Sequence, residues 1–273
     1  IMTFPSPNSI LLVAVVLPPR ALDVFGPVVA ERTVSTPYGN VGPIAQRRGA
    51  TDGPPDGVYV LPYSGLPERT DPRATLWAAK ELGVQRVLNW DAAVALNPLL
   101  RRGSILLAED YVDTTRHLPC SFFGEHGLGD LPQVPAFCPE MRRVLIQHLP
   151  DAHPAGVVIG VDVPRRETAT EARLFRSWGG DVITRNQVPE VALAKELELC
   201  YAGLCVVTDL AADHPSPQAT GEVRGALQSI LEVLPVVAAA LAGPPTCGCN
   251  QTMSGPRKQG LIGADWRTWV ESS

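Results

Sequence analysis

The regular alternation of short apolar runs with amphipathic stretches limits the fold of this chain more than any other feature. The runs at 9–17 and 201–208 are almost entirely apolar, which is typical of strands covered on both faces. Between such runs lie stretches with helical periodicity, such as 71–82, which Gly83 ends. This alternation predicts an α/β fold with a largely parallel sheet, helices on both faces and ligands at the carboxyl ends of the strands.

The same reading assigns the remaining elements. Short strands are predicted at 58–61, 87–89, 104–109, 156–161 and 182–183. Helices are predicted at 139–149, 167–178, 188–197 and 220–241, and Pro235 is expected to kink or break the last one. The segment 37–56 is expected to be a long loop or a weak hairpin. Since no linker or repeat divides the chain, we expect one domain over 1–243 and a C-terminal extension over 244–273.

Length and charge argue against several classes of protein. A chain of 273 residues, 45% of them hydrophobic, can bury the core of a globular domain. The formal net charge of −5 and the scattered lysines and arginines argue against a nucleic-acid partner. The apolar run at 10–18 is too short to cross a bilayer and lacks a basic flank. We therefore expect no membrane partner and a cytoplasmic protein.

Six cysteines are scattered along the chain, at 120, 138, 200, 205, 247 and 249. Four lie in apolar surroundings, where we expect reduced, buried side chains that act as small hydrophobic groups. Cys247-Gly248-Cys249 is a CxC pair, for which a strained disulfide or two free thiols are favoured over zinc, because no His or second Cys pair lies nearby at ligand spacing. We therefore expect no metal site and no cofactor.

One long stretch carries a family resemblance. Residues 178–209, WGGDVITRNQVPEVALAKELELCYAGLCVVTD, resemble the 5′-methylthioadenosine phosphorylase branch of the purine nucleoside phosphorylase superfamily. That branch has a similar W-G-A-D-V-I run, then V-P-E and L-A-K-E, and a strand that ends in T-D. The resemblance is good over 75–250 and poor before it. It implies a single α/β domain, with a central mixed sheet partly curled into a barrel and flanked by helices, and a homotrimer.

The resemblance also implies a phosphate site beside the nucleoside, and its first two pieces differ here. In the family, a G-G-T-G loop after the first strand donates backbone N–H groups to phosphate; residues 15–23 take its place. Pro18 and Pro19 in this loop have no N–H to donate. An R-H-G motif is expected after the next strand, where Tyr63 and Ser64 stand at the cationic pair.

The other two pieces of the phosphate site are also replaced. The stretch RVLNWDAAVA, residues 86–95, corresponds to the T-T-A-x-G-S motif of the family, with Trp90 and Asp91 at the two threonines. Arg185 and Asn186 correspond to a Met-Thr pair. A carboxylate repels phosphate, most strongly in a pocket of low dielectric constant. We therefore expect a main activity that does not use phosphate.

The nucleoside side of the implied site keeps one of its acids. The E-G-P-R-F run of the family corresponds to 162–166, so Asp162 replaces the glutamate and Arg166 the aromatic residue that packs on the base. The T-D-x-D motif, which holds and protonates the purine, keeps Asp209 and loses its second carboxylate. A family histidine supplied by a neighbouring subunit falls on Asp130.

Together these positions define a candidate site for a small-molecule substrate. Asp91 and Asp209 are the candidate catalytic acids, since a buried carboxyl near other acids has a raised pKa and can donate a proton. The residues expected to bind substrate are Trp90, Tyr63, Asp162, Arg165, Arg166, Arg185 and Asn186. The arginines either hold an anionic group or are ordinary surface charges. In the alternative, these residues form no functional site: the Trp90 indole packs in the core and Asp91 forms an ion pair with an arginine.

Three classes of function follow from the residues and the resemblance. In the first, a repurposed enzyme uses acid/base chemistry of aspartates without phosphate, either to hydrolyse a nucleoside or to cyclise or isomerise a metabolite through a cationic state, with the Trp90 ring stabilising the cation. In the second, a pseudoenzyme binds a nucleoside-like ligand without turnover. In the third, a methylthioadenosine or purine nucleoside phosphorylase has an atypical phosphate site. The first is the expectation taken forward.

Overall fold

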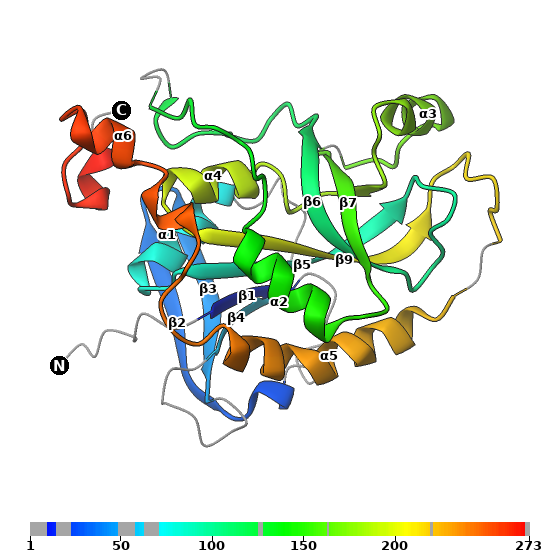
Figure 1. The fold of residues 1–273 in the computed structure, drawn as a ribbon, viewed down its shortest axis with the longest axis horizontal. Coiled ribbons are helices and arrows are strands. Elements are labelled where there is room, and N and C mark those ends of the chain that lie inside the picture. The colour runs from blue at the N-terminus through cyan, green and yellow to red at the C-terminus, as the bar shows by residue number, and fades with distance from the viewer. Residues whose placement is uncertain are drawn as a thin grey trace.

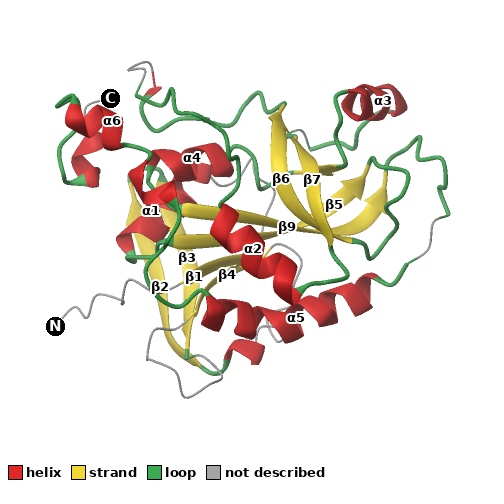
Figure 2. Cartoon of the chain, viewed as in Figure 1, coloured by secondary structure: helices red, strands yellow, loops and turns green. Residues whose placement is uncertain are grey.

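A mixed β-sheet runs through the centre of the computed structural model (Figures 1 and 2), which describes residues 10–14, 23–48, 58–62, 71–124, 128–162, 164–218 and 221–270. Within these ranges, nine strands pair in the order β2-β3-β4-β1-β5-β8-β7-β6-β9. Their bounds are β1 Ile10–Ala14, β2 Val28–Thr36, β3 Gly39–Arg47, β4 Val58–Pro62, β5 Arg86–Ala95, β6 Ile105–Asp113, β7 His153–Gly160, β8 Val182–Thr184 and β9 Cys200–Leu210.

Half of the sheet closes into a barrel. β9 pairs with β6 at the end of the order and also runs parallel to β5 along its whole length, so the strands β5, β8, β7, β6 and β9 form a ring. β5–β8 and β6–β9 are antiparallel, whereas β7 is parallel to both of its neighbours. The predicted α/β domain, with a mixed sheet partly curled into a barrel, is therefore confirmed, and the sheet is less parallel than the alternation alone suggested.

Helices cover the two faces of this sheet (Figure 1). α1 and α4 pack on one hydrophobic cluster, and α2 and α5 pack on a second one across the sheet. The helices are α1 Pro72–Glu81, α2 Pro139–His148, α3 Ala169–Ser177, α4 Glu190–Glu196, α5 Val223–Ala240 and α6 Ser254–Lys258. Neighbouring residues of β5 alternate between the clusters: Val87 belongs to the first and Leu88 to the second.

Local signals set the helix ends. The Asp71 side chain accepts the Arg73 N–H at the start of α1, and Gly83 follows its end with a φ of 72°. Thr168 and Glu171 form a capping box at the start of α3. Helix α5 continues through Pro235, so the predicted break at this proline is wrong. These caps explain why the predicted helices lie within a few residues of the observed ones.

The hairpin of β2 and β3 differs most from the expectation. Both strands have nine residues. β3 lies in the segment 37–56, where a long loop or weak hairpin was predicted, whereas β2 precedes that segment and was not predicted at all. Most side chains of β2 are exposed, so this edge strand shows no apolar run from which it could be predicted. The apolar side chains that do anchor the hairpin, Val41 and Ile44 of β3, are buried.

The C-terminal extension packs on the domain. After α5 the chain forms two short 3-10 turns, Gly248–Gln251 and Trp266–Trp269, with α6 between them. Met253 and Trp269 are buried in the same cluster as α1 and α4. The extension therefore contributes to the core rather than lying apart from it.

Among the described helices, α5 has the length and apolar composition that could span a membrane. This is a weak indication, because a core helix passes the same test. Ile230 and Leu234 of α5 are buried against the sheet, while Arg224, Gln228 and Glu232 lie on its exposed side. This distribution is typical of an amphipathic helix that covers a sheet.

A buried glutamate on α4 gives the fold a testable dependence on pH. Glu196 is 3% exposed and accepts the Phe122 N–H at 2.6 Å. Burial raises the pKa of Glu196 from 4.5 to about 7, although hydrogen bonds from the Phe122 N–H and the Ser121 hydroxyl oppose this shift. Since the folded pKa lies above the unfolded one, this contribution to stability is complete below about pH 4.5 and is lost as the pH rises through about 7.

We therefore expect the free energy of unfolding to fall by about 3 kcal/mol as the pH rises from 4.5 to 8, because Glu196 ionises in this range. Glu196→Gln keeps an oxygen for the Phe122 N–H and removes the titration, so its stability should change less over this range. Urea unfolding of both proteins at several pH values measures the difference. Equal pH profiles for the two proteins would show that Glu196 keeps an ordinary pKa.

Candidate functional site

Trp90 and Asp91 of β5 point to opposite faces of the sheet. Trp90 has no exposed surface and lies in the hydrophobic cluster under α2 and α5. Asp91 is 1% exposed and contacts Arg185 and Asn186 after β8. This corrects the expectation that the two side chains line one pocket, because successive residues of a strand alternate in direction. The position of Trp90 gives no support to a role in binding and matches core packing.

The Asp91 carboxylate holds the loop after β8. One oxygen accepts the backbone N–H groups of Arg185 at 3.2 Å and of Asn186 at 3.0 Å. The other accepts the Asn186 side-chain amide at 2.9 Å. Burial raises the pKa of Asp91 above its ordinary value, and these hydrogen bonds act against that shift. Asp91 is thus bound to the loop backbone, where the sequence alternative suggested an ion pair with an arginine.

A buried polar chain continues from this loop into the barrel. The Asn89 amide donates to the Asn186 carbonyl and to Glu190, both at 3.1 Å. The Tyr201 hydroxyl of β9 donates to the same Glu190 oxygen at 2.8 Å. Because a buried polar group is costly unless it is paired, these bonds fix the loop that carries Arg185 and Asn186.

Asp209 lies at the carboxyl end of β9 and is half exposed. Its carboxylate is 3.4 Å from the Arg166 guanidinium, which also donates to the Leu210 carbonyl at 3.2 Å. The register of β5 and β9 places Asp209 opposite Val94, three residues beyond Asp91. The two candidate acids therefore stand on neighbouring strands near the same end of the barrel, one exposed and one buried.

The structure brings the three arginines named from the sequence into one loop region. Arg165 forms an ion pair with Glu171 of α3 at 2.6 Å. The Arg185 guanidinium donates to the Arg165 carbonyl at 2.9 Å. Arg166, the next residue, reaches Asp209. The carboxyl end of the barrel therefore carries a group of guanidinium side chains.

Asp162 positions the chain after β6. One of its oxygens accepts the N–H groups of Arg116 at 2.7 Å and His117 at 2.5 Å. The pKa of Asp162 lies below its ordinary value: burial opposes this shift, and the two backbone hydrogen bonds outweigh it. The side chain is 2% exposed, and its other oxygen is buried with no hydrogen-bond partner among the described residues.

A cavity of about 150 Å³ lies beside this group, between α3 and the strands β7 and β8. Arg116, Arg165 and Arg185 line it together with the carboxylates of Asp162, Glu167 and Glu171. Three guanidinium groups around a small cavity can hold an anion, because each offers several N–H donors in one plane. Among the arginines that line the cavity, Arg116 was not predicted from the sequence, since no motif marks it.

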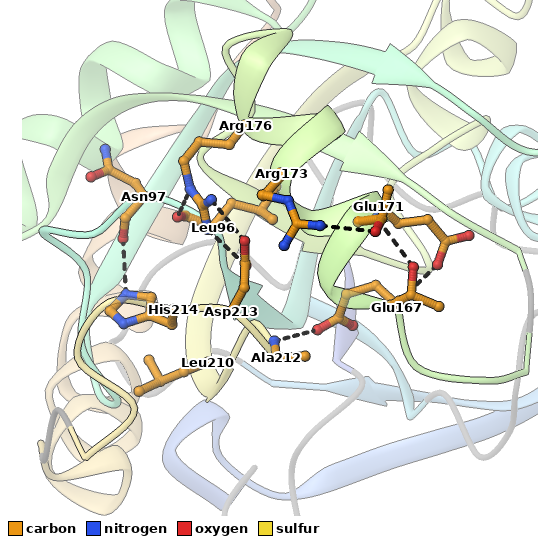
Figure 3. Close-up of polar contacts among 12 residues, drawn as sticks. Leu96, Asn97, Glu167, Glu171, Arg173, Arg176, Leu210, Ala212, Asp213 and His214 are labelled. Carbon is orange, nitrogen blue, oxygen red and sulfur yellow. Dashed lines mark hydrogen bonds and ion pairs between the residues drawn. The ribbon is translucent and has the colours of Figure 1, made fainter.

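Polar contacts hold α3 to the ends of β5 and β9 (Figure 3). Arg176 of α3 donates to the Leu96 carbonyl at 2.8 Å and forms an ion pair with Asp213 at 3.1 Å. The buried His214 ring is 3.3 Å from the Asn97 carbonyl. The segments that follow the two strands are thereby fixed relative to α3 and to the loop with Arg165.

Some residues named from the sequence lie outside the described ranges. These are Pro18 and Pro19 of the first loop and Tyr63 and Ser64 of the second. Their parts in the site stay predictions.

Comparisons with known proteins agree with this geometry. The family model described as "Phosphorylase superfamily" matches residues 15–242. The chain belongs to the phosphorylase superfamily. A 6-oxopurine nucleoside phosphorylase from Pyrococcus furiosus is 32% identical over 241 residues, which cover 82% of this chain and 91% of that protein. An S-methyl-5′-thioadenosine phosphorylase from Aedes aegypti is 31% identical, with 66% and 68% covered.

The fold of a solved structure agrees as well. A methylthioadenosine phosphorylase from an antarctic soil metagenomic library superposes with a TM-score of 0.81 at 21% identity and covers 98% of both chains. The resemblance to the methylthioadenosine phosphorylase branch is therefore confirmed. The superfamily is one of enzymes, and the relatives are phosphorylases, which use phosphate. They overturn the expectation of hydrolysis, cyclisation or isomerisation without phosphate.

That expectation failed because it treated each replaced family residue as a lost function. Asp91 was read as a charge that faces phosphate, whereas its oxygens accept the N–H groups of the loop after β8. A carboxylate satisfied in this way is directed at the protein backbone.

The contacts of Asp91 predict different outcomes for two substitutions. Asp91→Ala leaves two buried backbone N–H groups unpaired and should lower the free energy of unfolding by about 3 kcal/mol. Asp91→Asn keeps an oxygen for both groups and should change stability by about 1 kcal/mol or less. Urea unfolding at pH 7 measures both. Equal losses in the two variants would contradict the role given to the carboxylate oxygen.

Proposed function

We propose that this protein is a purine nucleoside phosphorylase of the methylthioadenosine type with an atypical phosphate site. The observation that carries the proposal is the group of Arg165, Arg166 and Arg185 in one loop region near the ends of β5 and β9, where Arg166 reaches Asp209. Relatives that share about a third of their residues with this chain are phosphorylases. The substrates would be a purine nucleoside and inorganic phosphate.

Arginine side chains would supply the charge that binds phosphate. Arg185 stands where the family has a neutral residue of its phosphate site, and its guanidinium lies beside the small cavity that Arg116 and Arg165 also line. Guanidinium groups bind phosphate through paired N–H donors and can replace the backbone donors that a proline-containing loop lacks. The atypical site would therefore exchange backbone contacts for side-chain charge.

Asp209 would act on the leaving base. In phosphorolysis the bond between C1′ of the sugar and the purine nitrogen breaks, with its electron pair moving to the base, and a phosphate oxygen forms the new bond to C1′. A protonated Asp209 carboxyl would donate its proton to the base as that bond breaks. Substrate would have to displace Arg166 from Asp209, and the 3.4 Å separation and solvent exposure of this pair make such an exchange inexpensive.

Asp91 would be a positioning residue in this scheme. It fixes the backbone of Arg185 and Asn186 and so sets the direction of the Arg185 side chain. The proposal also includes the homotrimer implied by the resemblance, in which the segment around Asp130 would lie near a neighbouring subunit. Light scattering on the purified protein measures this assembly.

Release of free base tests the proposed reaction directly. The protein is incubated with methylthioadenosine or inosine, with and without inorganic phosphate, and the bases are separated by chromatography. We expect adenine or hypoxanthine, together with the sugar 1-phosphate, only when phosphate is present. Base release that is equal without phosphate would indicate hydrolysis. If neither nucleoside releases its base at high protein concentration, the protein does not turn these substrates over, and the proposal fails.

Substitutions should separate the phosphate-binding and base-protonating roles. Arg185→Ala should raise the KM for phosphate by about 10-fold to 100-fold, because it removes a charge-assisted hydrogen bond. Asp209→Asn should lower kcat by about 100-fold or more with a smaller effect on that KM. Arg173→Ala is the matched control, since this exposed arginine of α3 contacts Thr170. A phosphate KM that does not change in Arg185→Ala would remove this residue from the phosphate site.

A further inference from the structure

Four cysteines that are far apart in the sequence meet at one point of the fold. Cys138 is the N-cap residue of α2, and Cys200 is the first residue of β9. Cys247 and Cys249 lie at the first 3-10 turn of the C-terminal extension. The four Sγ atoms all lie within 4.8 Å of one another. Cys247 is 3.3 Å from Cys200 and 3.6 Å from Cys138, measured between sulfur atoms.

This spacing fits a tetrahedral metal site. Four thiolates around Zn²⁺, each with a Zn–S distance of about 2.3 Å, place their sulfur atoms about 3.8 Å apart. The four cysteines are free thiols, and the distances of 3.3 Å and 3.6 Å between their sulfur atoms are longer than a disulfide bond, which is about 2.05 Å. We propose that Cys138, Cys200, Cys247 and Cys249 bind one zinc ion. This site is independent of the proposed phosphorylase activity.

The expectation of no metal site, drawn from the sequence, rested on local spacing. The CxC pair has no partner within a few residues, so it does not match a zinc motif. The other two ligands come from the start of a helix and the start of a strand, and the fold brings them to the pair. Only the path of the C-terminal extension over these two elements makes the set complete.

Hydrogen bonds hold the CxC segment in place around the sulfur atoms. Glu140 of α2 accepts the N–H groups of Thr246 at 2.8 Å and Cys247 at 3.1 Å. Its other oxygen pairs at 3.1 Å with Arg86, which is 1% exposed and donates to the Gly243 carbonyl at 2.7 Å. Outer contacts of this kind orient metal ligands, and here they tie the chain that leads into the CxC pair to α2 and β5.

The surroundings also suit the charge and the entry of the ion. Each thiol that binds the metal releases its proton to solvent, so four thiolates and Zn²⁺ carry a net charge of −2. Cys138 stands at the N-terminus of a ten-residue helix, where the helix dipole favours a thiolate. A cavity of about 400 Å³ reaches Cys138 and Cys249 and is also lined by Lys195, which gives an entry path and a nearby positive charge.

The position of the site indicates a structural role. Cys200 begins β9, whereas Asp209 lies near the other end of the same strand. The ion would join α2, β9 and the C-terminal extension at the end of the barrel away from the candidate active site. Zinc sites in which all four ligands are cysteines are closed and contribute to folding.

Metal binding by the full chain tests this proposal. The protein is purified under reducing conditions and its metal content is measured. The metal is then removed with a chelator, and Co²⁺ is titrated into the reduced protein. We expect one zinc per chain and, with Co²⁺, the thiolate charge-transfer band and strong visible bands of a tetrahedral cobalt thiolate site. Added Zn²⁺ should displace the cobalt and raise the thermal unfolding temperature.

Single substitutions assign the ligands. Cys249→Ser and Cys138→Ser should each weaken Zn²⁺ binding by at least about tenfold and reduce the cobalt charge-transfer band. Cys120→Ser is the control, because this exposed cysteine lies outside the cluster and should leave both unchanged. If a serine variant does not fold, the cobalt titration of the unaltered chain still shows whether the four cysteines bind a metal ion. Reduced protein with free thiols that takes up neither Co²⁺ nor Zn²⁺, or a metal site that survives both substitutions, would overturn the proposal.

Discussion

The parallel pairing of β5 with β9 is the contact on which the rest of the structure depends. It closes the barrel, separates the two hydrophobic clusters and sets Asp91 and Asp209 on neighbouring strands. β9 in turn begins at the cysteine cluster and ends at the candidate active site. A change in the register of this pair by one residue would turn every buried side chain of β9 to the opposite face.

The carboxyl end of this pair combines rigid and exchangeable contacts. Asp91 and the chain of Asn89, Glu190 and Tyr201 are buried and hydrogen-bonded, which fixes the backbone of the loop after β8. The Arg166–Asp209 pair at the surface is weak and open to solvent. The proposed reaction takes two polar substrates and would need both kinds of contact, because the frame has to hold its geometry while the exposed charges change partners.

Much of the fold could be predicted from the sequence, but less of the candidate site could. Apolar runs, the Asp71 cap and the Thr168 capping box located most elements, and the family-like stretch indicated the barrel. The edge strand β2 could not be predicted, because its side chains are mostly exposed and show no apolar pattern. Trp90 and Asp91 were assigned to one pocket although they alternate across a strand, and the loss of familiar phosphate residues suggested a change of chemistry that the relatives contradict. Convergence of side chains, as among the cysteines, depends on tertiary structure.

The contacts of the C-terminal extension have a consequence for where this chain can be cut. Glu140 and Arg86 are satisfied in part by the backbone of 243–247, and Met253 and Trp269 fill the cluster beneath α1 and α4. A shortened chain that ends near 243 would therefore lose the partners of a buried ion pair on one face and core volume on the other. The folding unit therefore includes the extension at least as far as Trp269, and a cut near residue 243 would remove part of it.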